Sequence, residues 1–475
     1  MKVAGIDSST QSTKVLVVDG ESGVVLRCGH ASHPSGTEVD PAVWWDALRA
    51  AIADAGGIGD CAAVSIAGQQ HGMVCLDARG EVIRPALLWN DTRSSGAARD
   101  LIREQSAQFW VEATGSAPVA SLTITKLRWL ADAEPANAAK IAAICLPHDW
   151  LTWKLSGSVD IHDLVTDRSD ASGTGYVDVR SGEYRYDLLA QALRISEDQA
   201  RAIVLPRIAE PFEIVGVVAS EYGTASLGAG CGDNAGAALA LGLKEGTASL
   251  SLGTSGVIAT VAQAPALDPA GEINSFMDAT GKWLPLACTL NGSRIIDYVK
   301  DLLGLSYRDI DHLAEKGNSN GLVLIPYFEG ERTPNMPSAT ATLFGLTPVS
   351  MNKEAFARSA CEAMCCLMRG ALEALKRVIP DIQRAVLVGG GAKSSVLPQL
   401  MADIMGIPIS IPTSRDALAS HEFVARGAAW QAARTVLPNL AVWPFDSTVC
   451  EPSGDGGDVW ERYQQYSRRY SDWAA

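Results

Sequence analysis

Short apolar runs alternate with amphipathic segments along most of the chain. Residues 3–19 predict two strands joined by a polar turn, and residues 62–80 repeat this pattern. Residues 41–56 have the spacing of a one-sided helix, opened by the capping residue Asp40 and the first-turn proline Pro41. Residues 123–135 predict a helix that a proline ends. Strands that alternate with helices in this way predict an α/β fold.

A second block repeats the opening hairpin. Residues 247–263 predict a strand, a turn of glycine, threonine and serine, and another strand. Residues 385–406 predict a buried strand, a small-residue loop and a helix that starts after the glycines. We therefore expect a duplicated architecture, with one domain over residues 1–244 and another over residues 245–475. No low-complexity linker separates the halves, so we expect the domains to pack together around a cleft.

Composition narrows the functional classes. The chain has 475 residues, too many for one ordinary core, and a net charge of −15. This acidic balance argues against nucleic acid or an anionic membrane surface as the main partner, but a pocket can still bind an anionic small molecule. No apolar run reaches membrane-spanning length, and no signal segment precedes the first strand.

The ten cysteines are scattered, and no pair has C-x-x-C spacing. This spacing excludes zinc-ribbon and thioredoxin-like sites. Cys361, Cys365 and Cys366 lie in a helical pattern, where we expect small buried hydrophobic side chains. A reducing cytoplasm fits this cysteine usage best.

Three loops at predicted strand ends are rich in N–H donors and hydroxyls: residues 7–14, 253–256 and 389–395. Such loops bind phosphate when their N–H groups converge and no side chain blocks the approach. Each loop alone fits an ordinary turn better, and the three together make phosphate binding as good an interpretation as ordinary turns. A P-loop is excluded, since G-x-x-x-x-G-K-[ST] is absent, and no G-x-G-x-x-G opens a helix after a strand.

Two carboxylates stand near these loops. Asp7 ends the first strand, and Asp233 lies with Asn234 in the glycine and alanine run GAGCGDNAGAALALG. Asp7 also fits a simple turn residue, and Asp233 fits a helix N-cap, which stabilises by about 1 kcal/mol. Small neighbours would equally allow a ligand to come close to Asp233, so the pattern leaves both interpretations open.

A polar cluster lies in residues 67–74 and 84–94. It offers amides, an imidazole and an aromatic face, a mixture that suits a polyhydroxylated ligand; its members are Gln69, Gln70, His71, Trp89, Asn90 and Asp91. A histidine in such a loop is as often a packed or surface residue as a ligand-binding one.

Eight motifs together resemble the FGGY carbohydrate kinases. They are GIDSSTQSTK, AGQQHGMV, RPALLWNDTRS, LPHDWLTWKLSG, GCGDNAGAALALG, SLGTSG, YFEGERTP and VGGGAKSS, in family order from Gly5 to about residue 435. The pair AGQQHG and WNDTRS most resembles the branch that acts on D-xylulose. The resemblance implies two actin-like, ribonuclease-H-like α/β domains with an interdomain cleft, sugar bound mostly on the first domain and Mg-ATP mostly on the second.

The resemblance also implies roles for single residues. Asp233 resembles the catalytic base that accepts the proton of the C5 hydroxyl, and a capping aspartate with a lowered pKa could serve if the proton moves late. Asp7 resembles the acid that orients Mg²⁺, through water. The remaining matches are sugar contacts from Gln70, His71 and Asn234, with Asn90 and Asp91 as braces, phosphate contacts from Thr10, Lys14, Gly253 and Thr254, and adenosine contacts from Gly391, Ala392 and Ser395.

Three positions depart from common family patterns. Ser395 stands where several relatives have asparagine, and Gln70 stands where some of the xylulose branch have methionine. Arg426 replaces a usual leucine, which we expect to alter the nucleotide edge and not the chemistry. The first two departures leave one nucleotide contact and the fine sugar preference open.

The implied activity is ATP-dependent phosphorylation of D-xylulose to D-xylulose 5-phosphate, with the sugar and ATP as partners. Ribulose, a pentitol, glycerol or gluconate are alternative substrates, because sugar choice depends on a few contacts. A non-catalytic actin-like sugar sensor is a third interpretation, disfavoured since Asp233 and the sugar cluster are both present. Relatives are often dimers, so a homodimer is expected from the resemblance alone.

Overall fold

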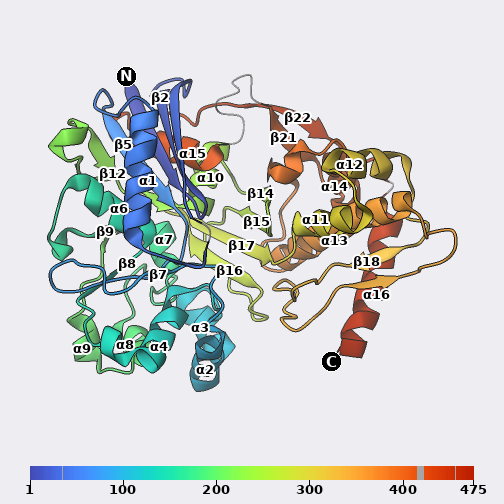
Figure 1. The fold of residues 1–475 in the computed structure, drawn as a ribbon, viewed down its shortest axis with the longest axis horizontal. Coiled ribbons are helices and arrows are strands. Elements are labelled where there is room, and N and C mark those ends of the chain that lie inside the picture. The colour runs from blue at the N-terminus through green and yellow to red at the C-terminus, as the bar shows by residue number, and fades with distance from the viewer. Residues whose placement is uncertain (35, 414–421, 455, 475) are drawn as a thin grey trace.

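The molecule has two lobes, each built around a mixed sheet of seven strands in the described part of the chain (Figure 1). The computed structural model describes residues 1–34, 36–413, 422–454 and 456–474. None of the helices in these ranges is long and apolar enough to cross a membrane. The two sheets confirm the predicted α/β fold with two similar halves.

The first sheet has the order β11-β12-β5-β1-β2-β3, with β13 also paired to β5. β1 and β2 form the predicted hairpin, and β1, β12 and β13 run parallel to β5, so that several strands end at one edge. The strands are β1 (Lys2–Ser8), β2 (Ser12–Asp19), β3 (Val25–Ser32), β5 (Ala63–Gly68), β11 (Ile214–Val217), β12 (Ser226–Gly228) and β13 (Cys231–Gly232).

The second sheet repeats this plan, with the order β16-β17-β15-β14-β20-β21-β22. The hairpin of β14 and β15 corresponds to that of β1 and β2, and β20 runs parallel to β14 as β5 does to β1. The strands are β14 (Thr247–Leu252), β15 (Gly256–Thr260), β16 (Ile273–Met277), β17 (Trp283–Thr289), β20 (Arg384–Gly389), β21 (Ile409–Thr413) and β22 (Asp446–Cys450).

Helices cover both sheets and fill the ends of the lobes. The predicted caps and stops are present: Asp40 accepts a hydrogen bond from Ala42 N at 2.9 Å, and the helix that starts at Thr123 ends before Pro135. The helices before residue 244 are α1 (Pro41–Asp54), α2 (Ser95–Gln105), α3 (Ala107–Thr114), α4 (Thr123–Ala133), α5 (Pro135–Ala138), α6 (Pro147–Ser156), α7 (Arg168–Ser172), α8 (Tyr186–Leu193), α9 (Glu197–Arg201) and α10 (Asp233–Leu241).

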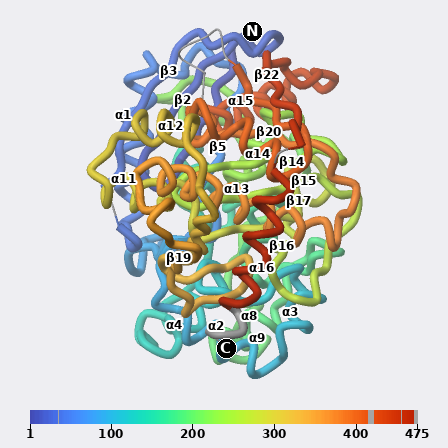
Figure 2. The backbone as a smooth tube through the Cα atoms, turned by 90° about the vertical axis from the view of Figure 1, so that its right-hand side faces the viewer, coloured from blue at the N-terminus to red at the C-terminus, as the bar shows by residue number. Residues whose placement is uncertain are grey.

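The later helices are divided between the lobes. α15 packs back on α10 and on β1 and β5 of the first lobe, while α16 lies along the outer face of the second lobe beside α13 (Figure 2). These helices are α11 (Arg294–Leu303), α12 (Tyr307–Lys316), α13 (Lys353–Lys376), α14 (Leu397–Met405), α15 (Phe423–Val436) and α16 (Gly457–Ala474). The domain boundary at residue 244 stays a prediction. Although α15 follows this boundary in the sequence, it packs on the first lobe.

Short strand pairs and turns complete the described chain. They are β4 (Glu38–Val39) with β7 (Ala86–Leu87), β6 (Val74–Leu76) with β8 (Ala143–Cys145), β9 (Val165–Asp167) with β10 (Arg207–Ala209), β18 (Val323–Ile325) with β19 (Thr342–Phe344), and the 3-10 turns η1 (Ile161–Asp163), η2 (Ser220–Tyr222) and η3 (Gly390–Lys393).

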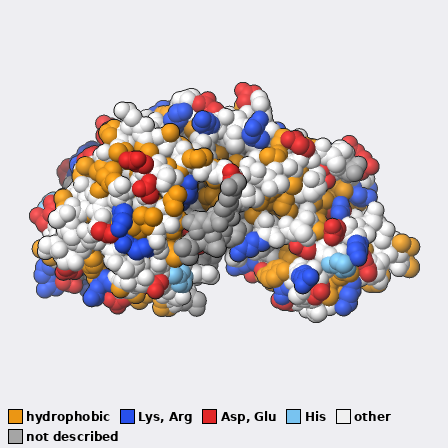
Figure 3. All heavy atoms as spheres, turned by 90° about the horizontal axis from the view of Figure 1, so that it is seen from above, with side chains coloured by type: hydrophobic (Ala, Val, Ile, Leu, Met, Phe, Trp, Pro, Cys, Tyr) orange, Lys and Arg blue, Asp and Glu red, His pale blue; other side chains and the backbone are white. Residues whose placement is uncertain are grey.

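The hydrophobic core continues from one lobe into the other. One cluster of buried side chains joins Trp110 and Leu189 of the first lobe to Phe276 and Leu286 of the second. Cys361, Cys365 and Cys366 lie in the core of the second lobe, as predicted, and all ten cysteines are free thiols. In Figure 3 the outline of the molecule is indented between the lobes, and acidic and basic side chains are interspersed on the face shown. This shared core holds the two lobes against each other.

Candidate active site

Asp7 and Asp233 meet at the edge of the first sheet. Asp7 is the next-to-last residue of β1, and Asp233 is the first residue of α10, directly after β13. Asp7 is 3% exposed and accepts a hydrogen bond from Ser9 Oγ at 2.6 Å. Asp233 is half-buried and accepts hydrogen bonds from Asn234 N at 2.7 Å and Asn234 Nδ2 at 3.1 Å. Asp7 pairs with Ala67 of β5, and Gly232, just before Asp233, pairs with the next residue Gly68, so the two acids are neighbours in space.

Burial changes the protonation of both acids. It raises the pKa of Asp7 to about 6, although Ser9 and Lys14 act in the opposite direction. Desolvation and then the charge of Asp7 raise the pKa of Asp233 to about 7. The expected lowered pKa of Asp233 is therefore wrong. The helix N-cap is Gly232, not Asp233, and the loss of water outweighs the favourable N–H groups of the helix end.

The first hairpin brings Thr10 and Lys14 to the same edge. Lys14 faces Asp7 across the strand pair, with Nζ 4.0 Å from Asp7 Oδ2 and 2.6 Å from Glu422 Oε2. Thr10 accepts a hydrogen bond from Trp89 Nε1 at 2.9 Å and donates one to Gln69 Oε1 at 3.3 Å. The hairpin turn thus lies between the acid pair and the predicted sugar cluster.

Gln70 and Asn234 hold each other beside Asp233. Asn234 Nδ2 donates to Gln70 Oε1 at 3.0 Å, and Gln70 Nε2 lies 3.5 Å from Ser169 O. A Cβ atom at Gly232 would lie 2.7 Å from the Gln70 amide, so a larger residue there would displace the Gln70 side chain. Small residues around Asp233 therefore make room for the predicted sugar cluster.

His71 presents one ring nitrogen as an acceptor. Its Nδ1 lies 2.7 Å from Gly173 O, and because a carbonyl only accepts, Nδ1 carries the hydrogen. Burial lowers the pKa of His71 to about 3, with further effects from Lys126 and Arg332. The ring is therefore neutral near pH 7, and its Nε2 lone pair can accept a hydrogen bond from a hydroxyl. Lys126 Nζ also donates to the backbone oxygen of His71 at 2.9 Å, which holds the loop.

A buried charge cluster that the sequence analysis did not assign supports α7, the helix behind this site. His148 Nδ1 lies 2.8 Å from Asp170 Oδ2 and 3.2 Å from Asp149 Oδ1. Burial alone would lower the pKa of His148, but the two carboxylates outweigh it and raise the pKa to about 10. The neighbouring Ser169 Oγ accepts a hydrogen bond from Gly232 N at 3.0 Å.

The cluster of His148, Asp149 and Asp170 also has metal-ligand spacing, with ligand atoms within 4.8 Å of one another. His148 Nδ1 is hydrogen-bonded to Asp170 Oδ2, whereas Asp149 Oδ1, at 3.2 Å, forms no hydrogen bond within the described residues. This hydrogen bond and the attraction between the histidine and the nearby acids account for the short distances in the cluster. The motif LPHDW contains His148 and Asp149, but the sequence does not show that α6 packs beside Asp170 of α7.

The second predicted phosphate turn lies exposed between β14 and β15. Gly253 O accepts a hydrogen bond from Ser293 N at 2.8 Å, and Gly253 and Thr254 are open to solvent. Ser293 also lines a cavity of about 650 Å³ between α11, α12, α13 and η3. The turn and the cavity therefore adjoin.

The third loop forms one wall of this cavity. Gly391 and Ser395 line it, whereas Ala392 packs against the core of the second lobe. The volume is in the range of small-molecule sites. Asp311 of α12 holds the loop: it accepts hydrogen bonds from Ser394 Oγ at 2.7 Å and from Ser395 N at 2.9 Å. The sequence analysis missed Asp311, because nothing in its local pattern indicates this contact.

The remaining predicted positions lie further out. Asp91 is buried and accepts a hydrogen bond from Thr37 Oγ1 at 2.8 Å, while Asn90 is exposed. Arg426 was expected at the nucleotide edge, but its guanidinium donates to Gly23 O at 3.0 Å and Pro444 O at 3.3 Å. It thus joins segments beside the first sheet.

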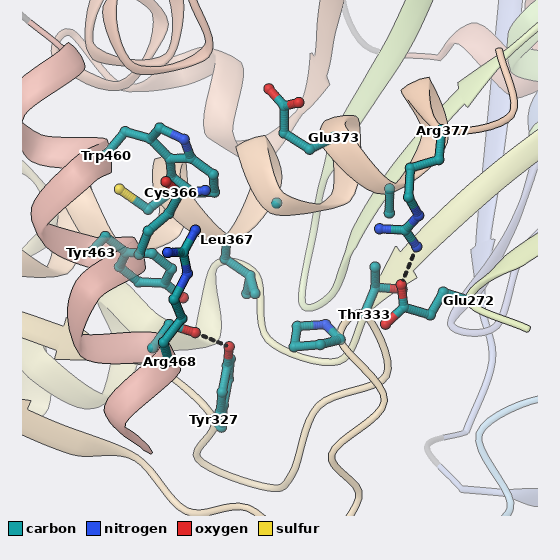
Figure 4. A pocket seen from close by; sticks show the side chains of 15 residues that line it. Glu272, Tyr327, Thr333, Cys366, Leu367, Glu373, Arg377, Trp460, Tyr463 and Arg468 are labelled. Carbon is teal, nitrogen blue, oxygen red and sulfur yellow. Dashed lines mark hydrogen bonds and ion pairs between the residues drawn. The ribbon is translucent and has the colours of Figure 1, made fainter. Parts of the chain in front are cut away.

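A separate cavity of about 270 Å³ lies between α13 and α16 (Figure 4). Trp460 and Tyr463 line it from α16, and Leu367 lines it from α13. None of the site residues predicted from the sequence lines this cavity. This cavity is therefore separate from the predicted site.

The chain matches two family models and is similar to curated proteins. The N-terminal domain model of the FGGY family of carbohydrate kinases matches residues 2–239, and its C-terminal domain model matches residues 248–436. The xylulose kinase of Streptomyces coelicolor is 43% identical over 443 residues, which cover 91% of this chain and 87% of that protein.

Solved structures extend the comparison. The xylulose kinase from Bifidobacterium adolescentis superposes with a TM-score of 0.90 at 42% identity, covering 98% of this chain and 99% of the other. The gluconate kinase from Lactobacillus acidophilus has a TM-score of 0.89 at 22% identity, covering 100% of this chain and 98% of the other. The latter likeness shows the fold alone, so the fold by itself does not select a sugar.

Proposed function

The chain belongs to the FGGY family of carbohydrate kinases, and from this premise we propose that it transfers the γ-phosphoryl group of ATP to the C5 hydroxyl of D-xylulose. The product would be D-xylulose 5-phosphate. The family implies ATP as the donor, and the xylulose kinases at 42–43% identity support the choice of sugar. The observation that carries the proposal is Asp233, a half-buried acid beside the Gln70 and Asn234 amides, with a pKa raised to about 7.

In the proposed reaction Asp233 accepts the proton of the attacking hydroxyl. A pKa of about 7 makes it a usable base near neutral pH without strong basicity. Phosphoryl transfer has a loose transition state, so positioning contributes more than base strength. Gln70, His71 and Asn234 would orient the sugar, with His71 Nε2 accepting from one of its hydroxyls.

The nucleotide would extend from the acid pair into the large cavity. Thr10, Lys14, Gly253 and Thr254 are proposed phosphate contacts; Gly391, Ala392 and Ser395 are proposed contacts on the adenosine side. Gly391 and Ser395 line the cavity of about 650 Å³, which supports this half of the proposal. Ala392 packs on the core, so we assign it a supporting position in the loop.

The donor set at the acid pair fits Mg²⁺. Asp7 offers a buried carboxylate that Ser9 holds by one hydrogen bond and that Lys14 approaches only to 4.0 Å, and hard oxygen ligands are those that Mg²⁺ prefers. Asp7 would hold the ion, through water. A bound Mg²⁺ supplies neutralising charge to the phosphates.

A coupled assay of ADP release tests the proposal. Mg-ATP is combined with D-xylulose, D-ribulose, L-ribulose, xylitol, D-arabinitol, glycerol or gluconate, with a no-sugar control, and kcat/KM values are compared. We expect strong preference for D-xylulose. Preference for another sugar or polyol would support kinase activity but contradict D-xylulose as the substrate. Absence of any sugar-dependent ADP release would overturn the proposed function.

Two further proposals concern the setting of the enzyme. Ten free thiols fit a reducing compartment, so we propose a cytoplasmic location. A homodimer is proposed from the family resemblance, and light scattering on the purified chain tests it.

A further inference from the structure

The motif YFEGERTP, residues Tyr327–Pro334, has no role in the proposal so far. It lies between β18 and β19 in the second lobe. Glu331 is 1% exposed, and its carboxylate accepts hydrogen bonds from Leu290 N at 2.6 Å and Asn291 Nδ2 at 2.9 Å. Glu331 thereby fixes the turn that leads to Ser293, whose N–H binds the phosphate turn at Gly253.

The next residue, Arg332, reaches in another direction. Its Nη2 donates to Asn274 Oδ1 of β16 at 3.0 Å. Asn274 and Phe276 share one face of β16, because side chains alternate along a strand. The Phe276 ring lies 5.4 Å from the His71 ring, centre to centre. The Arg332 guanidinium is therefore held on the face of β16 that meets His71 of the first lobe.

The electrostatics agree with this placement. The positive charge of Arg332 contributes to the lowered pKa of His71. Burial raises the pKa of Cys288, where Arg332 acts to lower it and Asp233 to raise it. Arg332 and Asp233 therefore both lie near Cys288, and Arg332 also lies near His71.

Arg332 has a cationic group available for a ligand. In residues 1–34, 36–413, 422–454 and 456–474, no carboxylate forms an ion pair with its guanidinium, and the side chain is only partly buried. A guanidinium has five N–H donors, of which one hydrogen bond to Asn274 uses a single group. The remaining donors can bind oxygen atoms of a guest molecule.

We propose that Arg332 is a sugar-binding residue contributed by the second lobe, donating hydrogen bonds to oxygen atoms of the sugar held by Gln70, His71 and Asn234. The inference rests on the proposed function. Its neighbours His71 and Phe276 belong to the sugar side, whereas the phosphate turn is braced by Glu331. The sugar would then bridge both lobes, so its binding depends on the second lobe as well as the first.

Sugar affinity and kinetics of Arg332→Gln and Arg332→Lys test the proposal. Calorimetry gives the Kd for D-xylulose without ATP, and the coupled assay gives KM for both substrates. Loss of a charged hydrogen bond predicts a rise of about 10- to 100-fold in sugar Kd and KM for the glutamine variant. The lysine variant should bind the sugar more tightly than the glutamine variant, because lysine keeps the positive charge although it lacks the planar pair of N–H donors of arginine. The KM for ATP should not change.

The control is Arg377→Gln. Arg377 also supports the segment before β16, through its ion pair with Glu272, but it lies at the outer cavity (Figure 4). This variant should bind sugar like the wild type. Asn274→Ala gives a second variant in case Arg332→Gln does not fold, and it should weaken sugar binding several-fold because the guanidinium loses its holder.

Unchanged sugar Kd in folded variants would overturn the inference, as would a fall in kcat alone with both KM values unchanged. If the wild type and the Arg332 variants bind the sugar equally well, the inference about Arg332 is contradicted, but the proposed function is not. A folded wild type that binds none of the tested sugars overturns the proposed function itself.

Discussion

At the scale of the residue, the surroundings of Asp233 decide what it can do. A carboxylate at a helix N-terminus is normally stabilised in its charged form by the helix dipole. Here burial and the nearby Asp7 raise its pKa to about 7 instead. Because ionised Asp233 is costly to keep in this environment, its carboxylate can accept a proton near neutral pH.

Replacement of this acid should separate catalysis from stability. Asp233→Asn removes the proposed base, and kcat should fall by about 10²- to 10⁴-fold. Stability should stay the same or rise, because a desolvated acid that repels Asp7 is removed. ADP release and urea unfolding measure the two effects, with Asp46→Asn on the exposed face of α1 as the control. A folded Asp233→Asn protein with wild-type turnover would refute the assignment.

The raised pKa also predicts the pH profile. Asp233 acts as a base only when deprotonated, so kcat/KM should rise with pH through about 7 and level off above it. The group binds a proton in the folded state below this value, whereas in the unfolded chain it ionises near the ordinary aspartate pKa of 3.8. Its cost to stability is therefore absent below the unfolded pKa of 3.8, grows as the pH rises toward the folded pKa of about 7, and is complete above it.

Initial rates in overlapping buffers check this prediction, with the coupling enzymes in excess at every pH. A profile that is flat across the neutral range would contradict it.

At the scale of the element, close packing of α15 on the first lobe sets the position of α10. A Cβ atom at Gly427 would lie 1.8 Å from Gly236 O of α10, and one at Gly5 would lie 2.0 Å from Ala425 O. Gln431 Nε2 of α15 also donates to Gly230 O at 2.7 Å, just before β13. Since Asp233 begins α10, α15 supports the acid from behind.

This packing predicts a large difference between two helical glycines. Gly427→Ala forces backbone apart and should destabilise the fold by about 1–3 kcal/mol or more. Gly370→Ala in α13 meets only the Trp460 ring at 3.9 Å and should stabilise by about 0.5–1 kcal/mol, since alanine favours helix. Urea unfolding of both variants measures the difference, and equal stabilities would show that α10 and α15 can separate freely.

At the scale of the whole molecule, the proposed sugar and nucleotide positions lie in different lobes. The amide and imidazole cluster lies on the first lobe, and the cavity of about 650 Å³ lies in the second. The shared core and the contact of Phe276 with His71 join them. Variants in the amide and imidazole cluster should therefore act mainly on the sugar, and variants around the cavity should act mainly on ATP. Arg332 differs in that it lies in the second lobe and should act on the sugar.

Asp311 gives the nucleotide side of this prediction. Asp311→Ala frees the loop at Ser394 and Ser395, so the KM for ATP should rise about tenfold while the Kd for the sugar stays constant. Asp301→Ala, which removes an acid exposed on α11, is the control. Steady-state kinetics with each substrate varied in turn measure both effects. An equal rise in both constants would indicate that the loop acts on the whole fold.

Much of the fold could be predicted from local sequence patterns. Apolar runs and turn residues identified the hairpins at residues 3–19 and 247–263, and capping residues located the helix after Asp40, because strand and helix periodicity are properties of neighbouring residues. The motifs likewise pointed to Asp7, Asp233, Gln70 and His71 before any contact was known.

The sequence by itself thus determined the alternation of elements, the duplicated plan and the chemical types at the site. Only the tertiary structure decided which groups face each other: Arg332 with Asn274, 58 residues apart, and Asp311 with Ser394, 83 residues apart. It also decided the protonation of Asp233, whose pKa is raised by burial and by Asp7. The physical reason is that desolvation and charge–charge interactions depend on distance in space, which the spacing of residues along the chain does not specify.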